Sequence, residues 1–135
     1  MLNESFFFNT IELAIRRTHI LKSKKDIDEL FIHKKRIHGQ HVSIVYQYVT
    51  NRVYSFKVGF SVPKRSIRFA HQRNLLKRRL RESFRPLIPN IEKIAKEKGL
   101  SVHLMLVYSG KTVQTSAKIK EDIYNAVMKL VHCNK

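Results

Sequence analysis

Residues 73–83 read RNLLKRRLRES and combine five cationic side chains with three leucines. If the chain is helical from about residue 70 to residue 85, Leu76, Leu80 and Phe84 recur every four residues and share one face. A neighbouring stripe with the same spacing is cationic and consists of Arg73, Lys77, Arg81 and Arg85. The segment therefore predicts a helix that packs through leucines and presents its charges outward.

The charges of this helix have few acidic neighbours. Residues 57–85 contain ten Lys or Arg and one acidic residue, Glu82. Each pair of like charges four residues apart destabilises a helix by about 0.2–0.5 kcal/mol, so this run of cations indicates an external anion that relieves the repulsion. The alternative is a basic face that is simply solvated. The whole chain has 27 Lys and Arg against 10 Asp and Glu, a formal net charge of +17. Such a balance is typical of proteins that bind nucleic acid.

The composition predicts one globular domain. The 135 residues are 43% hydrophobic and show no internal repeat. Residues 1–22 are poorly patterned and are interpreted as an N-terminal extension, with the folded domain at 23–135. The single cysteine, Cys133, cannot form an internal disulfide. No Lys or Arg precedes Arg16, so the positively charged start of a secretory signal peptide is missing. No apolar stretch approaches the ~18 residues of a membrane span. We therefore expect a cytoplasmic protein without membrane contact.

Hydrophobic periodicity predicts the elements α-β-β-α-β-α. The expected bounds are a helix at 24–34, strands at 42–48 and 54–62, a helix at 70–85, a short helix at 90–99, a strand at 102–108 and a helix from about 116. A further short strand is possible at 36–40. The strands at 42–48 and 54–62 are separated by Thr50, Asn51 and Arg52, and this spacing predicts that they form a hairpin. Asn90 is the expected cap of the short helix and Gly99 its end.

Catalytic and metal-binding patterns are weak. The acids are scattered, and three of them, Asp26, Asp28 and Glu29, share one helix start, where they favour the helix dipole. The histidines at 33, 38 and 41 have a vaguely metal-like spacing but cross a predicted turn without a cysteine nearby. We predict no catalytic residue and no metal site in the protein.

The motifs GFSVPKR at 59–65, AHQRN at 70–74, KR at 77–78 and RESFR at 81–85 resemble the signature of the protein component of bacterial ribonuclease P. Residues 24–31, KKDIDELF, resemble the first helix of that family. The chain departs from the family pattern at two positions: Leu75 replaces a usual arginine, and Ile27 replaces a usual aromatic residue.

The resemblance implies an α+β fold, a single-domain α-β sandwich with a four-stranded sheet. Its implied topology is that of domain 2 of ribosomal protein S5, with a left-handed β-α-β crossover that departs from the usual right-handed rule. It also implies a ribonucleoprotein in which a catalytic RNA removes the 5′ leader of precursor tRNA with Mg²⁺, while the protein binds both RNAs. The protein alone is then inactive and needs no protein partner.

The resemblance and the charge pattern together give two sets of candidate site residues. The first is expected to bind the catalytic RNA and contains Lys64, Arg65, Arg68, Arg73, Asn74, Lys77, Arg78, Arg81 and Arg85. The second is expected to form a cleft for the single-stranded leader, between the first helix and the sheet, and contains Lys24, Ile27, Phe31, Val45, Tyr46 and Phe60. Aromatics on strands are also typical of a core, and Asn74 could instead cap a helix.

Two other functions remain open at this stage. A basic ribosomal or general RNA-chaperone protein would explain the charge but not the spacing of the 73–82 motif. A basic helix that lies on a membrane surface would need its leucines to face lipid.

Overall fold

The computed structural model describes residues 20–21, 24–33, 35–50 and 56–133. Its centre is a four-stranded mixed sheet in the order β1-β2-β4-β3. The strands are β1 (Arg36–His38), β2 (Val42–Val49), β3 (Phe56–Ser61) and β4 (Ser101–Tyr108). Strand β2 is antiparallel to β1 and β4, whereas β3 is parallel to β4. The expected α+β class, the four-stranded sheet and the short strand after residue 35 are confirmed.

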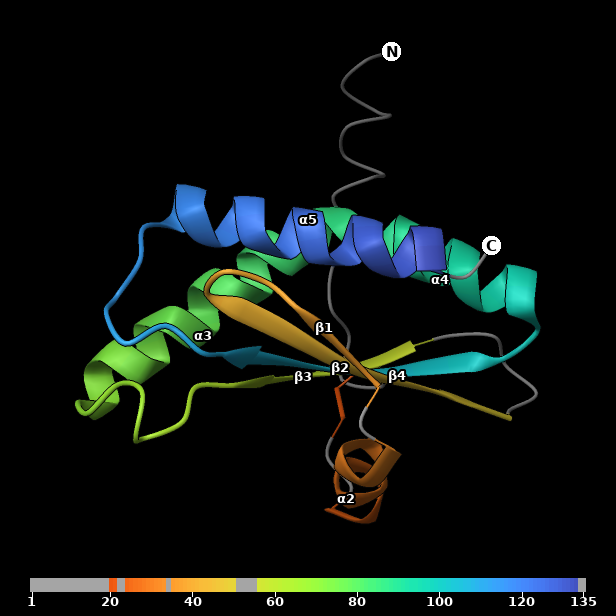
Figure 1. Cartoon of the computed structure of the whole chain (residues 1–135), viewed down its shortest axis with the longest axis horizontal. Helices are drawn as coiled ribbons and strands as arrows, with labels where there is room; N and C mark the ends of the chain where they lie inside the picture. Colours follow the sequence, from red (N-terminus) through yellow and green to blue (C-terminus); the bar gives the residue numbers. More distant parts are fainter. Residues whose placement is uncertain (1–19, 22–23, 34, 51–55, 134–135) are drawn as a thin grey trace.

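Helices cover the two faces of the sheet unequally. Helix α2 (Lys24–His33) lies on one face, whereas α3 (Ala70–Phe84), α4 (Ile88–Lys98) and α5 (Ser116–Cys133) lie on the other (Figure 1). A single turn of 3₁₀-helix, η2 (Arg85–Leu87), joins α3 to α4. Pro86 lies within this turn, and α3 ends just before it because proline cannot continue the hydrogen-bond ladder of a helix.

The main core lies between the sheet and helices α3, α4 and α5, which cover one of its faces. The apolar faces expected for the strands and helices are confirmed there, since Leu76, Leu80 and Phe84 of α3 are fully buried. Helix α5 buries its predicted stripe of Ile119, Ile123, Val127 and Leu130. The leucines of α3 therefore contact protein. A helix that lies on a membrane surface would need these leucines to face lipid, so the structure contradicts that alternative for α3.

A second, smaller core lies under α2. It consists of Leu21, Leu30, Val45 and Met105, with Ile27 and Val107 partly buried against it. The backbone N–H of Leu21 donates to the carbonyl oxygen of Val58 at 3.0 Å, so residues 20–21 pair with the sheet. The folded unit thus begins before residue 23, inside the segment interpreted as an extension. Residues 1–19 lie outside the described part of the chain.

The predicted hairpin between β2 and β3 is wrong. Strand β4 lies between them and pairs with β2 from Val42↔Tyr108 to Val49↔Ser101, and with β3 from Phe56↔Val102 to Ser61↔Val107. A short connection allows a hairpin but does not require one. The sequence of β4 itself carries a signal for a central position, because it is apolar without interruption from Leu104 to Tyr108, as expected for a strand buried on both faces.

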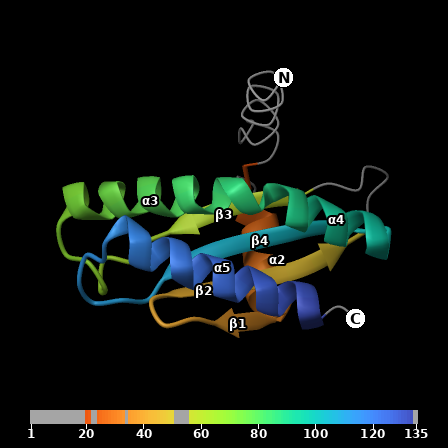
Figure 2. The same ribbon diagram turned by 90° about the horizontal axis from the view of Figure 1, so that it is seen from above.

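Strands β3 and β4 run in the same direction and are joined through α3 and α4. Seen from the helix side in Figure 2, both strands run from right to left, and the chain returns in front of the sheet to the neighbour below. This geometry is a left-handed crossover, as the resemblance implied and contrary to the usual preference.

Two smaller expectations about helix ends are wrong. Helix α4 begins at Ile88, with a proline in its first turn, so Asn90 lies inside the helix and does not cap it. Asn74 lies inside α3, whose N-cap position is Phe69, so the alternative of Asn74 as a helix cap is excluded. Gly99 ends α4 as predicted, with φ of 65°, a left-handed conformation that glycine adopts without strain.

Candidate nucleic-acid interface

The basic face of α3 is built as the sequence predicts. With Leu76 and Leu80 buried, the residues between them point away from the core. Eight of the nine residues expected to bind RNA are exposed: Lys64, Arg65, Arg68, Asn74, Lys77, Arg78, Arg81 and Arg85. The ninth, Arg73, is half-buried. The unusual Leu75 is also half-buried and adds no charge to this surface.

The cations on α3 differ in how far they are already engaged. The Arg73 guanidinium donates to the carbonyl oxygens of Ile67 and Arg68 at 2.9 and 2.7 Å, so it anchors the loop before α3. Arg78 lies 3.5 Å from Glu82, in an exposed pair that contributes little to stability. Arg73 therefore has a structural role that its regular spacing with Lys77 and Arg81 did not indicate.

A cavity of about 330 Å³ lies beside the edge strand β3, between α2 and α3. Its apolar lining comes from Ile20, Leu21, Ile27, Gly59, Phe60 and Met105, and its basic lining from Lys77 and Arg81. The Arg81 guanidinium lies 5.9 Å from the centre of the Phe60 ring, within range of a cation-π contact. The basic stripe and the expected leader cleft thus meet in one cavity, which the separate motifs did not predict.

The structure separates the six residues of the expected leader cleft. Ile27 and Phe60 line the cavity. Lys24 and Phe31 are exposed on α2, and Phe31 is 38% exposed. Val45 is buried beneath α2 and is part of the smaller core. The placement of Tyr46 in the cleft is wrong, because Tyr46 packs against the main core on the opposite face of the sheet.

The cavity residues that the sequence analysis missed are Ile20, Leu21, Gly59 and Met105. A glycine inside a strand pattern is a known sign of close approach, and a Cβ on Gly59 would lie 2.7 Å from Cε of Met105. Ile20 and Leu21 lie in a stretch without clear periodicity, so no local signal pointed to them.

A buried histidine lies on the α2 face of the sheet. His103 in β4 is opposite Gln47 in β2 and Lys57 in β3. Burial is the largest influence on the pKa of His103 and lowers it, and the positive charge of Lys57 acts in the same direction. The carboxylates of Asp26 and Glu29 oppose this shift, but the pKa remains lowered. The neutral imidazole is therefore favoured in the folded protein.

This histidine predicts a loss of stability in mild acid. The unfolded chain binds the proton of His103 more readily, so the free energy of unfolding should fall as the pH drops below about 6.5, the unperturbed histidine pKa. Urea unfolding at pH 5 to 8 would measure this dependence. His103→Gln should flatten it, whereas exposed His38→Gln should leave it unchanged, and identical slopes for both variants would refute the assignment.

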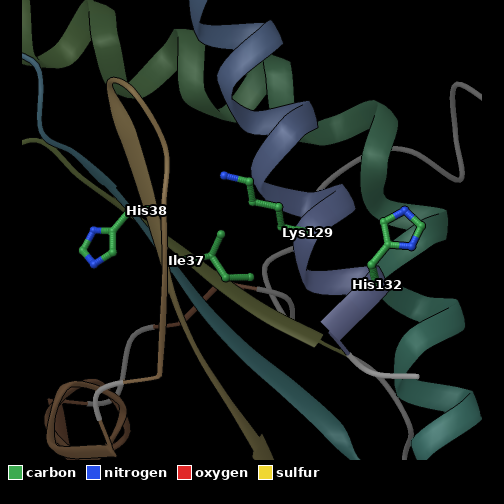
Figure 3. A pocket seen from close by; sticks show the side chains of 4 residues that line it. All are labelled: Ile37, His38, Lys129 and His132. Carbon is green, nitrogen blue, oxygen red and sulfur yellow. The ribbon is translucent and has the colours of Figure 1, made fainter.

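A cavity at the opposite edge of the sheet lies apart from the basic surface. It has a volume of about 560 Å³ and is lined by Ile37, His38, Lys129 and His132. Figure 3 shows Lys129 of α5 extending toward Ile37 of β1, with His38 on the other side of the strand. No group of three or more His, Cys, Asp or Glu side chains in the described residues could hold a metal ion, and none of the described helices has the length and apolar character needed to cross a membrane.

Comparison with solved structures supports this fold. The chain is similar to the RNase P protein from Staphylococcus aureus, with a TM-score of 0.62, 18% identity, and coverage of 83% of this chain and 94% of that chain. A mutant of that protein, described as defective in mRNA degradation activity, gives a TM-score of 0.68 at 17% identity, over 93% of this chain and 95% of that chain. At these identities the likeness concerns the fold alone.

Sequence comparison gives the family. The ribonuclease P protein component of Onion yellows phytoplasma (strain OY-M) is 39% identical over 75 residues, which are 56% of this chain and 52% of that protein. The corresponding component of Mycoplasma genitalium (strain ATCC 33530 / DSM 19775 / NCTC 10195 / G37) is 27% identical over 92 residues, 68% of this chain and 66% of that protein. The chain thus spans between half and two thirds of the length of these relatives. Because the family model described as Ribonuclease P matches residues 15–131, this chain belongs to the Ribonuclease P family.

Proposed function

We propose that this chain is the protein subunit of a ribonuclease P ribonucleoprotein, which removes the 5′ leader from precursor tRNA. In this proposal the exposed basic face of α3 and the loop before it bind the partner RNA. The cavity between α2 and α3 receives part of the single-stranded leader. The family membership and the uncompensated charge of residues 57–85 both support an RNA partner.

The observation that carries the proposal is the shared cavity beside β3. Lys77 and Arg81 reach it from the basic helix, while Ile27 and Phe60 supply its apolar lining. Unpaired RNA is bound in this way, with phosphates on cations and bases against apolar or aromatic groups. Phe31 remains a proposed stacking residue outside the cavity lining, with Lys24 as a cation on the same helix. Val45 and Tyr46 are left out of the proposed cleft, since neither lines the cavity and neither side chain is exposed.

We assign the cleavage chemistry to the RNA subunit and its Mg²⁺ ions. Asp122 is the acidic side chain buried in the described part of the chain, and its Oδ2 accepts a hydrogen bond from the backbone N–H of His41 at 2.7 Å. That carboxylate joins α5 to the start of β2 and so has a structural partner. The Mg²⁺ that the holoenzyme needs would be held by RNA phosphates, and the protein would supply binding and orientation.

Reconstitution tests this proposal. The chain combined with a bacterial ribonuclease P RNA is expected to release the 5′ leader of a precursor tRNA at a Mg²⁺ concentration at which the RNA alone is slow. The chain alone is expected to leave the precursor intact. Product length on a gel and the end group of the mature 5′ terminus are the measurements.

Two results would contradict the proposal. RNA-free cleavage by the protein that stops on addition of EDTA would place the chemistry in the chain. Equal binding to unrelated structured RNAs, with no stimulation of the ribonuclease P RNA, would instead favour a ribosomal or general RNA-chaperone protein.

A further inference from the structure

An exposed aromatic ring stands at the start of the basic helix. Phe69 occupies the N-cap position of α3 and is 54% exposed. Its ring lies 5.8 Å from the imidazole of His71 with a tilt of 31°, and the Arg68 guanidinium lies 5.8 Å from its centre. A single exposed apolar side chain is ordinary, but this one is flanked by a cation and a second flat ring.

A basic cavity adjoins this ring. It has a volume of about 420 Å³ and lies between the loop before α3 and the loop after β4. Its lining includes Phe69 and three cations, Arg65, Arg68 and Lys111, and none of the residues that line it is acidic. The first turn of α3 also contains no acidic residue, so nothing there opposes an anion.

The loop before α3 is held in place by its own hydrogen bonds. The backbone N–H groups of Ser66 and Ile67 both donate to the Pro63 carbonyl oxygen at 3.1 Å. Arg73, in the first turn of α3, donates hydrogen bonds to the carbonyl oxygens of Ile67 and Arg68. The backbone that carries Arg65, Arg68 and Phe69 is thus fixed before any ligand arrives.

The opposite wall of the cavity is fixed as well. The buried Tyr108 hydroxyl donates to the Thr112 carbonyl oxygen at 2.5 Å and accepts the Gln114 N–H at 3.2 Å. Arg79 donates from α3 to the Gln114 carbonyl oxygen at 2.5 Å. These bonds tie the loop that carries Lys111 to the helix that follows Phe69. Preorganisation of this kind lowers the cost of binding.

We propose that Phe69 is a stacking site for one unpaired nucleotide of the partner RNA, whose phosphates contact Arg65, Arg68 and Lys111. An aromatic face beside clustered cations matches a base joined to its phosphates, whereas a free phosphate would make no use of the ring. The inference rests on the proposed function. It adds a site to the expected one, because Phe69 precedes Lys77 and Arg81 by eight and twelve residues, or about 12 and 18 Å along a helix.

The absence of tryptophan from the sequence gives a direct test. Phe69→Trp places a single indole at the proposed site, and a stacked base should quench its fluorescence. The probes are an unstructured ten-nucleotide RNA and an abasic strand with the same number of phosphates. Only the strand with bases should quench Phe69→Trp, although both should bind through charge. The control is Tyr124→Trp on α5, where the native tyrosine is 52% exposed, and neither strand should quench it.

Affinity measurements on the otherwise unchanged chain complete the test. Phe69→Ala and Phe69→Leu should each weaken binding of the ten-nucleotide RNA by about 5- to 150-fold, the range for loss of one stacked base, whereas Phe69→Tyr should retain it. Ribonuclease P RNA should also quench Phe69→Trp and should compete with the ten-nucleotide RNA for the site. Absence of quenching by ribonuclease P RNA, under conditions where that RNA binds the unmodified chain, would overturn the assignment to the partner RNA.

The remaining outcomes separate this inference from the proposed function. Equal quenching by the abasic strand, or unchanged affinity in Phe69→Ala together with weakened binding in Lys77→Gln, would overturn the stacking site and leave the proposed function intact. Failure of the unmodified chain to bind either the ten-nucleotide RNA or ribonuclease P RNA would overturn both.

Discussion

Replacement of Lys77 and Arg81 together by glutamine is expected to lower the salt dependence of RNA binding by about 1.4 to 1.8 in log–log slope, or about 0.7 to 0.9 for each lost phosphate contact. Both side chains are cationic, lie on the exposed face of α3 and line the cavity beside β3. Their loss removes charge from the basic stripe and from the proposed leader cleft at once. Titration of ribonuclease P RNA at several KCl concentrations would measure the slope.

The matched control removes two charges elsewhere. Lys96 on α4 and Lys129 on α5 are exposed and lie outside the basic stripe. Their double replacement by glutamine changes the net charge equally but should leave the slope nearly unchanged. If both double variants lose the same slope, binding follows total charge and the face of α3 has no special role. Arg73 is tested separately, because its replacement would also release the loop at residues 67–68.

The second large effect concerns stability. Leu80→Ala is expected to lower the free energy of unfolding by about 2 to 5 kcal/mol, since it removes a fully buried side chain and leaves a cavity between α3 and the sheet. Urea unfolding followed by circular dichroism would measure the change. The salt slope of RNA binding should persist in the protein that remains folded, because no charge is altered.

Leu75 on the same helix provides the control for this substitution. It is half-buried and lies outside the main core, so Leu75→Ala should cost much less than Leu80→Ala. Equal losses for the two substitutions would mean that helix propensity or residual structure in the unfolded chain, and not core packing, determines the effect.

Local patterns predicted most of the elements and faces of this fold. The spacing of Leu76, Leu80 and Phe84 predicted the buried side of α3 because a helix has one fixed period, and the alternation in β2 and β3 did the same for the sheet. The hairpin predicted from the two neighbouring strands was wrong, because the pairing of β4 with both β2 and β3 depends on contacts between distant parts of the chain.

The candidate site shows the same division. Charge and motif identified the exposed cations of α3 from the sequence. They could not reveal that Arg73 binds two backbone carbonyl groups, or that Tyr46 and Val45 point to opposite faces of the sheet and into two different cores. Successive side chains of a strand point to opposite faces of the sheet, so Val45 and Tyr46 could not both belong to one cleft.

The position of β4 in the sheet has a consequence for the order in which the protein can be made. A ribosome completes β1, β2, β3 and the basic helix α3 before it reaches residue 101, yet β3 pairs with no other named strand than β4. Until β4 emerges, the nascent chain has a two-stranded β1–β2 unit, which is marginal alone, and a basic helix with no complete sheet to pack on. Acquisition of the native sheet is therefore a late event in synthesis, and the ten cations of residues 57–85 are made before the strand that completes the sheet.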